Sequence, residues 1–134
     1  MTGAQWIDHF GGCIPEYPVH IVDPDHPITR GIDSFVMRGV TSYNEAGERV
    51  ADGTEQYFCL VDPAVRVLCT TTFSAEHNPP GRHPIGGKTQ PYAWTNQYGE
   101  GKVFVAAWGH TDGDFAIPQA KELVTQGLVW AARE

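Results

Sequence analysis

The sequence lacks most features that would place it in a membrane, on nucleic acid or outside the cell. Its apolar runs are short, and none approaches the roughly 20 residues that cross a bilayer. Lys and Arg number only 9 against 16 Asp and Glu, and they are scattered, which argues against nucleic-acid binding. The opening MTGAQWIDHFGG has no basic start ahead of an apolar block, so it does not resemble a secretory signal. We therefore expect a cytoplasmic protein without membrane or nucleic-acid partners.

Cysteine is also scarce, and Cys13, Cys59 and Cys69 follow no metal-binding spacing. Cys59 and Cys69 lie inside apolar runs, which predicts buried free thiols, with a disulfide or zinc site as the weaker alternative. The sequence contains no phosphate loop, dinucleotide fingerprint or nucleophile elbow. A nucleotide enzyme is therefore disfavoured, and no cofactor is expected.

What is present indicates one globular domain with several strands and a C-terminal helix. The 134 residues are 41% hydrophobic and 19% charged. Apolar residues recur at three- and four-residue steps from Pro118 to Ala132, which predicts an amphipathic helix. Residues 1–10 are interpreted as a short helix, 44–53 as a loop, and 73–91 as a long Pro- and Gly-rich loop. Strands are predicted at 18–22, 33–39, 55–61, 65–72, 92–98 and 102–108, the last two joined as a hairpin.

The run KVFVAAW (102–108) is apolar on both faces, as is typical of a central strand covered from two sides. A single helix cannot cover both faces of a sheet. The pattern therefore predicts that a partner, most simply a second copy of the chain, covers the other face, so a homo-oligomer is expected.

Four segments carry a family resemblance when taken together and in order. DPDHPITRGI, GTEQYF, YAWTNQYGEGKVFVAAWGHT and ELVTQGLVWAA resemble the trehalose-utilisation, or ThuA-like, family. The resemblance implies a link to sugar utilisation and an α/β fold, flavodoxin-like and related to class I glutamine amidotransferases. It covers the C-terminal portion of the family domain, so residues 1–134 are expected to be a single partial domain lacking the N-terminal half, with a mixed sheet and a C-terminal helix.

The end of the KVFVAAW strand is the first candidate site. Ligands of open α/β sheets bind beyond the carboxyl ends of strands, where His110 lies, with Asp112 two residues on. The amidotransferase relatives place a catalytic His here, with an acidic residue two positions later. The resemblance therefore implies catalytic roles for His110 and Asp112, in which the carboxylate orients the imidazole. The alternative is a histidine that only caps the loop.

Glu55 and Tyr57 are the second candidates, because strand alternation places both on one face. The resemblance marks an acidic and an aromatic residue here. A carboxylate beside a phenol suits acid–base work, or binding of a hydroxyl-rich ligand, so Glu55 is expected to be catalytic and Tyr57 to bind ligand. The alternative is a solvated strand face. We also expect Glu55 and His110 to share one cleft.

Trp94 and His26 complete the predicted ligand-binding set, each with a structural alternative. Trp94 is either a stacking surface for a sugar or a core residue. His26 precedes a proline, so a turn role competes with ligand binding. A metal site from His77, His83 and Glu76 is the weaker interpretation, because their spacing matches no metal motif. Two functions stay open: binding or modifying a sugar, or a non-catalytic binding or assembly module.

Overall fold

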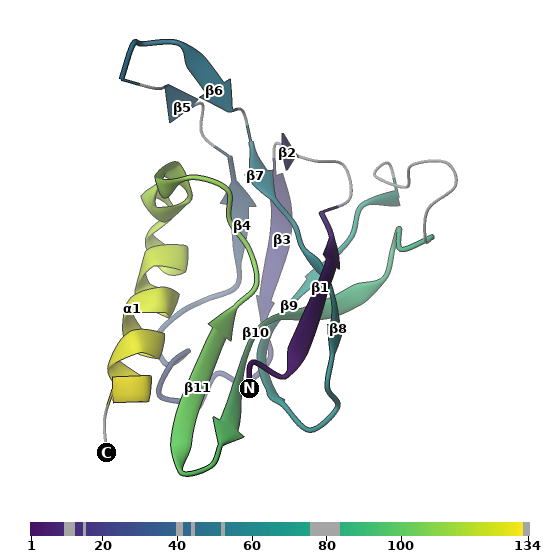
Figure 1. Cartoon of the computed structure of the whole chain (residues 1–134), viewed down its shortest axis with the longest axis vertical. Helices are drawn as coiled ribbons and strands as arrows, with labels where there is room; N and C mark the ends of the chain where they lie inside the picture. The colour runs from purple at the N-terminus through teal and green to yellow at the C-terminus, as the bar shows by residue number, and fades with distance from the viewer. Residues whose placement is uncertain are drawn as a thin grey trace.

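The computed structural model describes residues 1–9, 13–14, 16–39, 42–43, 45–51, 53–75 and 84–132. Its centre is a five-stranded sheet with the order β11-β10-β9-β3-β4, in which every neighbouring pair is antiparallel (Figure 1). The strands are β3 (Glu16–Ile21), β4 (Phe35–Arg38), β9 (Arg66–Thr72), β10 (Thr89–Tyr98) and β11 (Gly101–Ala106). The predicted strands at 18–22, 33–39 and 65–72 and the β10–β11 hairpin are confirmed.

Three short antiparallel pairs and two helical segments complete the described chain. The pairs are β1 (Ala4–Asp8) with β8 (Phe58–Val61), β2 (Cys13–Ile14) with β7 (Thr54–Glu55), and β5 (Ser42–Tyr43) with β6 (Arg49–Ala51). The helical segments are the 3-10 helix η2 (Asp112–Ala116) and the helix α1 (Pro118–Ala132). The mixed α/β class with a C-terminal helix is confirmed, and the arrangement is consistent with a partial flavodoxin-like fold.

Helix α1 covers one face of the sheet, as its apolar periodicity predicts. Ala120 and Leu123 are fully buried in a cluster that includes Phe104 of β11. Gly127 lies so close to this strand that a Cβ there would be 2.2 Å from the Phe104 ring. A glycine at this position therefore allows the helix to approach β11 closely.

The β1·β8 pair covers part of the opposite face, on the side of the sheet away from α1 (Figure 1). Trp94, Val105 and Ala107 of the sheet pack there against Cys59 and Ala4. Since Phe104 faces the helix, strand alternation turns its neighbour Val105 toward β1 and β8. The chain therefore contributes cover to both faces of β11.

This arrangement corrects the predicted place of the KVFVAAW strand. β11 is an edge strand of the sheet and not a central one. It is apolar on both faces because α1 packs on one side and the β1·β8 pair on the other. An apolar pattern on both faces shows that a strand is covered from both sides. It does not show whether a second strand is hydrogen-bonded along each of its edges.

Other local predictions were partly wrong. In place of the expected helix over residues 1–10, the chain forms strand β1 at Ala4–Asp8, because these residues pair with β8. The expected strand 55–61 is divided between β7 and β8, and the expected loop 44–53 contains β6. Residues 89–91 of the expected long loop belong to β10, while residues 76–83 lie outside the described residues.

Cys59 and Cys69 are buried free thiols, as predicted. Among the described residues, no helix is long and apolar enough to span a bilayer.

Candidate functional site

The candidate site is built around a contact between Glu55, at the end of β7, and His110, in the loop after β11. Nδ1 of His110 lies 2.9 Å from Oε1 of Glu55. The Glu55 side chain is only 11% exposed, whereas that of His110 is 37% exposed. The prediction that these two residues share one cleft holds for their direct contact but not for their lining, because Glu55 and His110 line different cavities. A neutral imidazole that donates from Nδ1 keeps Nε2 free as a proton acceptor.

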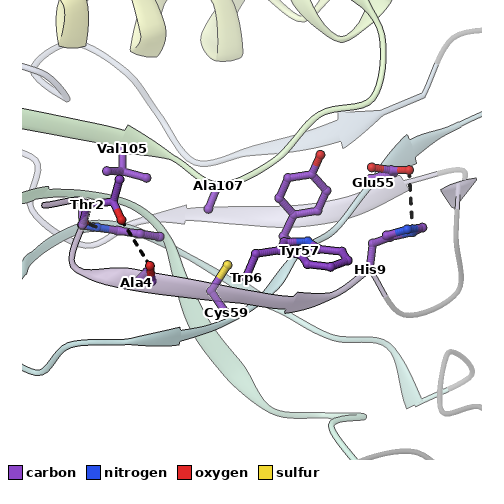
Figure 2. Close-up of a pocket in the computed structure, with 10 residues that line it drawn as sticks. Thr2, Ala4, Trp6, His9, Glu55, Tyr57, Cys59, Val105 and Ala107 are labelled. Carbon is purple, nitrogen blue, oxygen red and sulfur yellow. Dashed lines mark hydrogen bonds and ion pairs between the residues drawn. The ribbon is translucent and has the colours of Figure 1, made fainter.

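A second imidazole, that of His9, approaches the same carboxylate. Its Nδ1 is 3.7 Å from Glu55 Oε1 (Figure 2), and it is buried without a hydrogen-bond partner in the part of the chain that the structure describes. A β-bulge brings it there: Trp6 pairs with Cys59 and Asp8 with Phe58, so Ile7 is an extra residue in β1. Such an insertion shifts the alternation by one residue. The bulge therefore turns His9, in place of Asp8, to the face that Trp6 occupies.

The backbone that carries His110 is held from two sides. Tyr57 donates its Oη hydrogen to the carbonyl oxygen of Gly109 at 2.6 Å. On the other side, the amides of His110 and Thr111 donate to Oδ2 of Asp114 at 2.6 and 3.0 Å. Gly109 itself has a φ of +103°, which only glycine adopts at little cost. These contacts fix where the imidazole leaves the chain.

A cavity of about 600 Å³ lies beside Glu55, between β1, β8 and the sheet (Figure 2). Trp6 is 53% exposed at this cavity, with its ring edge-on to Tyr57 at 6.4 Å and 5.9 Å from the His9 ring. The cavity is lined by Thr2, Ala4, Trp6, His9, Glu55, Tyr57, Cys59, Trp94, Val105 and Ala107. Its walls are largely apolar, and its polar groups gather around the Glu55 carboxylate.

A second cavity, of about 550 Å³, lies on the His110 side of the pair. It is lined by Ala106, Trp108, Gly109, His110, Thr111, Asp112, Phe115 and Val124. The contact between Glu55, which lines the first cavity, and His110, which lines the second, therefore joins the two linings. Because Nδ1 of His110 faces Glu55, Nε2 is the nitrogen left for a ligand.

Burial favours the neutral forms of Tyr57 and Cys59 in the wall of the first cavity. It raises the pKa of Tyr57 to about 12, with a smaller contribution from the negative charge of Glu55, so the phenol remains a hydrogen-bond donor. Burial also raises the pKa of the Cys59 thiol, which makes it a poor nucleophile despite its place in the cavity wall.

The structure brings most of the predicted residues together. Glu55, Tyr57 and Trp94 line the first cavity, although Trp94 is fully buried and donates its indole N–H to the carbonyl oxygen of Thr2 at 2.9 Å. Asp112 lies at the second cavity and is exposed. The carboxylate found on the imidazole is that of Glu55 and not, as expected, that of Asp112.

His26 lies elsewhere and lines neither cavity. It is buried, it accepts a hydrogen bond from the Ile28 amide at Nδ1, and its ring packs 5.5 Å from that of Trp130. Burial lowers its pKa, with the nearby Arg66 adding to the effect. These contacts fit the turn role that was the alternative to ligand binding.

The weaker metal prediction falls on His77, His83 and Glu76, which lie outside the described residues. Within the part of the chain that the structure describes, no three His, Cys, Asp or Glu side chains are grouped as a metal ion would need.

Sequence reasoning missed three residues of the site: Trp6, His9 and Asp114. The first two were hidden by the expected helix, and no sequence signal marks the bulge that turns His9 inward. Asp114 did leave a signal, because TDGD has the spacing of a capping box, in which an acidic side chain binds the amide three residues before it.

Comparison with known proteins gives one match. The model of a family named ThuA and described as trehalose utilisation matches residues 1–131. No curated protein and no solved structure matches the chain.

Proposed function

The chain belongs to the ThuA family, whose description associates it with carbohydrate use, and from this premise we propose that it binds a sugar or sugar derivative beside Glu55 and acts on it through the Glu55–His110 pair. The observation that carries the proposal is the 2.9 Å contact between these side chains, each of which lines a cavity. Such a contact between a buried carboxylate and an accessible imidazole is the arrangement that acid–base catalysis uses.

The first cavity suits a sugar because it combines an exposed aromatic face with acceptors and donors of hydrogen bonds. The Trp6 ring offers an apolar surface to the C–H face of a pyranose. Glu55 accepts hydrogen bonds from hydroxyl groups, and among the described residues no hydrogen-bond partner of His9 Nδ1 would compete with a ligand. A site of this kind orients a ligand by few polar groups within a largely apolar wall.

In the proposed mechanism, His110 moves the proton and Glu55 supports it. The carboxylate holds the imidazole through Nδ1. It stabilises the positive charge that appears when Nε2 takes a proton from the part of the ligand that extends past Glu55 into the second cavity. Burial of Glu55 strengthens this effect, because the local dielectric constant is lower than that of water. Tyr57 holds the loop through Gly109 and stays neutral.

Calorimetric titration with trehalose and with glucose tests binding. We expect Trp6→Ala to weaken binding about tenfold, the order of one lost aromatic contact. Tyr98→Ala is the matched control, because Tyr98 is also an exposed aromatic residue, at the β10–β11 hairpin outside both cavities. Equal affinities of wild type and Trp6→Ala, or no binding of either sugar, would contradict the proposal.

Variants of the Glu55–His110 pair separate binding from chemistry. Glu55→Gln retains the shape but removes the charge, so we expect the protein to keep binding sugar while losing turnover. A wild-type protein that binds a sugar but does not turn it over would favour the non-catalytic alternative.

A second candidate function, assembly, is favoured by the edge of the sheet. β11 lies at the edge of the five-stranded sheet, and Phe115, which is 43% exposed, lines the second cavity beside it. Open edges of this kind pair readily with another strand. We propose that a second copy of the chain packs here. Sedimentation at micromolar concentration would show a dimer, and a clean monomer would refute this.

A further inference from the structure

Asp114 is a fully buried carboxylate, and only one of its two oxygens is bonded by the residues that the structure describes. Oδ2 accepts hydrogen bonds from the amides of His110 and Thr111. Oδ1 is buried without a donor from the described residues. A buried carboxylate is costly unless its oxygens receive hydrogen bonds, so Oδ1 needs a donor close by.

Three further side chains bury polar atoms that have no hydrogen-bond partner among the described residues. These atoms are Thr54 Oγ1, Tyr92 Oη and Trp108 Nε1. The rings of Tyr92 and Trp108 are parallel, with an interplanar angle of 1° and centroids 5.7 Å apart. The Trp108 ring also lies 5.6 Å from that of Phe115, the residue that follows Asp114 in η2.

The chemistry of these atoms is complementary. The indole of Trp108 can only donate, the carboxylate of Asp114 can only accept, and the hydroxyl groups of Thr54 and Tyr92 can do both. An internal water needs two to four such partners, and waters in this setting are part of the structure. A single water that accepts from Trp108 and donates to Asp114 would satisfy both.

We propose that Asp114 is a positioning residue for His110, and that its second oxygen is held by an internal water shared with Trp108 and Tyr92. This inference rests on the proposed role of His110. The ionised acceptor makes stronger hydrogen bonds to the His110 and Thr111 amides than a neutral one would. Together with Tyr57 on Gly109, it clamps the chain on both sides of the imidazole. The 2.9 Å contact to Glu55 depends on that clamp.

The test measures the imidazole of His110 in the ligand-free protein, so it does not depend on sugar binding. Long-range nitrogen NMR, at a pH where the imidazole is neutral, distinguishes the Nδ1–H tautomer from the Nε2–H tautomer. Wild type is expected to show one tautomer, with the proton on Nδ1. In Asp114→Ala the chemical shifts of the two ring nitrogens should converge, because the loop no longer presents Nδ1 to Glu55. In Asp114→Asn the difference between these shifts should lie between those of the wild type and Asp114→Ala.

Asp62→Asn is the matched control. The Asp62 carboxylate also accepts a hydrogen bond from a backbone amide, that of Ala64 at 2.8 Å, but it does so in an exposed turn. Its substitution should leave the His110 spectrum unchanged. If Asp114→Ala lowers stability yet keeps the wild-type tautomer, Asp114 is only a structural residue and the proposal is wrong.

Asp114→Asn keeps the proposal testable if the alanine variant does not fold. The amide can still accept from the two backbone N–H groups, but its NH₂ group replaces Oδ1 and competes with the Trp108 N–H as a donor. We therefore expect the Trp108 indole signal to shift and its cross-peak with water, present in the wild type, to disappear. A wild-type indole without that cross-peak would overturn the internal water, and an unchanged His110 spectrum in Asp114→Asn would overturn the positioning role.

Discussion

Replacing Gly109 by alanine is expected to disturb the site through the backbone alone. An added Cβ would lie 3.5 Å from Oδ2 of Asp114, an ordinary contact, so there is room for a methyl group. The φ of +103°, however, is one that a residue with a Cβ adopts at a cost of about 1–3 kcal/mol. If the chain relaxes to a negative φ instead, it loses the Tyr57 bond to Gly109 and the Asp114 bond to His110, at about 1–3 kcal/mol each.

The expected loss of stability is therefore about 1–3 kcal/mol, or about 3–10 °C in melting temperature for a chain of this length. Gly31→Ala is the control, because Gly31 has a φ of +81° and open space around it, in the turn between β3 and β4. Both variants should lose similar stability in calorimetric unfolding, but only Gly109→Ala should weaken trehalose binding. A wild-type melting temperature for Gly109→Ala, or the same loss of binding in both variants, would show that the backbone conformation of Gly109 does not hold the site.

Three further outcomes follow from burial and packing. Burial raises the pKa of three tyrosines, so their protonated forms stabilise the fold below pH 10, and this stability is lost as the pH rises through their folded-state values. They are Tyr17, Tyr57 and Tyr92. Ultraviolet titration should show them ionising late or only on unfolding, and Tyr57→Phe should reduce the loss between pH 10 and 12. His26 has a lowered pKa, so its contribution to the stability of the fold is present above pH 6.5 and is lost as the pH falls through its folded-state pKa. The urea midpoints at pH 7.5 and pH 5 should therefore differ less in His26→Gln than in the wild type. Gly127→Ala should destabilise by about 1–3 kcal/mol in urea because its Cβ would meet Phe104, and adding Phe104→Leu should recover part of that loss.

The elements that could be predicted from the sequence are those whose apolar residues alone show which of their faces is buried. The helix from Pro118 to Ala132 shows its buried face at three- and four-residue steps, and it has the predicted limits. The β10–β11 hairpin followed from a glycine-rich turn between two apolar runs. The contact between Glu55 and His110 could be predicted from two local features. Strand alternation gives the face to which Glu55 points, and the end of a strand is where ligand-binding side chains such as His110 lie in open α/β sheets.

What could not be predicted depends on pairing between distant segments. Residues 4–8 become a strand because β8 lies beside them, and the extra Ile7, visible only in that pairing, turns His9 toward Glu55. The edge position of β11 likewise depends on the strand order, which an apolar run does not encode. Asp112 and Asp114 both follow His110 closely, and only the fold of η2 shows that the second is buried under the loop.

The central claim is that a sugar binds beside Glu55 and His110, and nitrogen–proton NMR during titration with trehalose tests it most directly. We expect the indole N–H of Trp6 and the backbone amide of His110 to shift together as trehalose is added, with one dissociation constant. The indole N–H of Trp130, which lines neither of the two cavities, should stay in place. Signals of Trp6 and His110 that remain unmoved at saturating trehalose and glucose, or shifts confined to Trp130 and the surface around it, would contradict the claim.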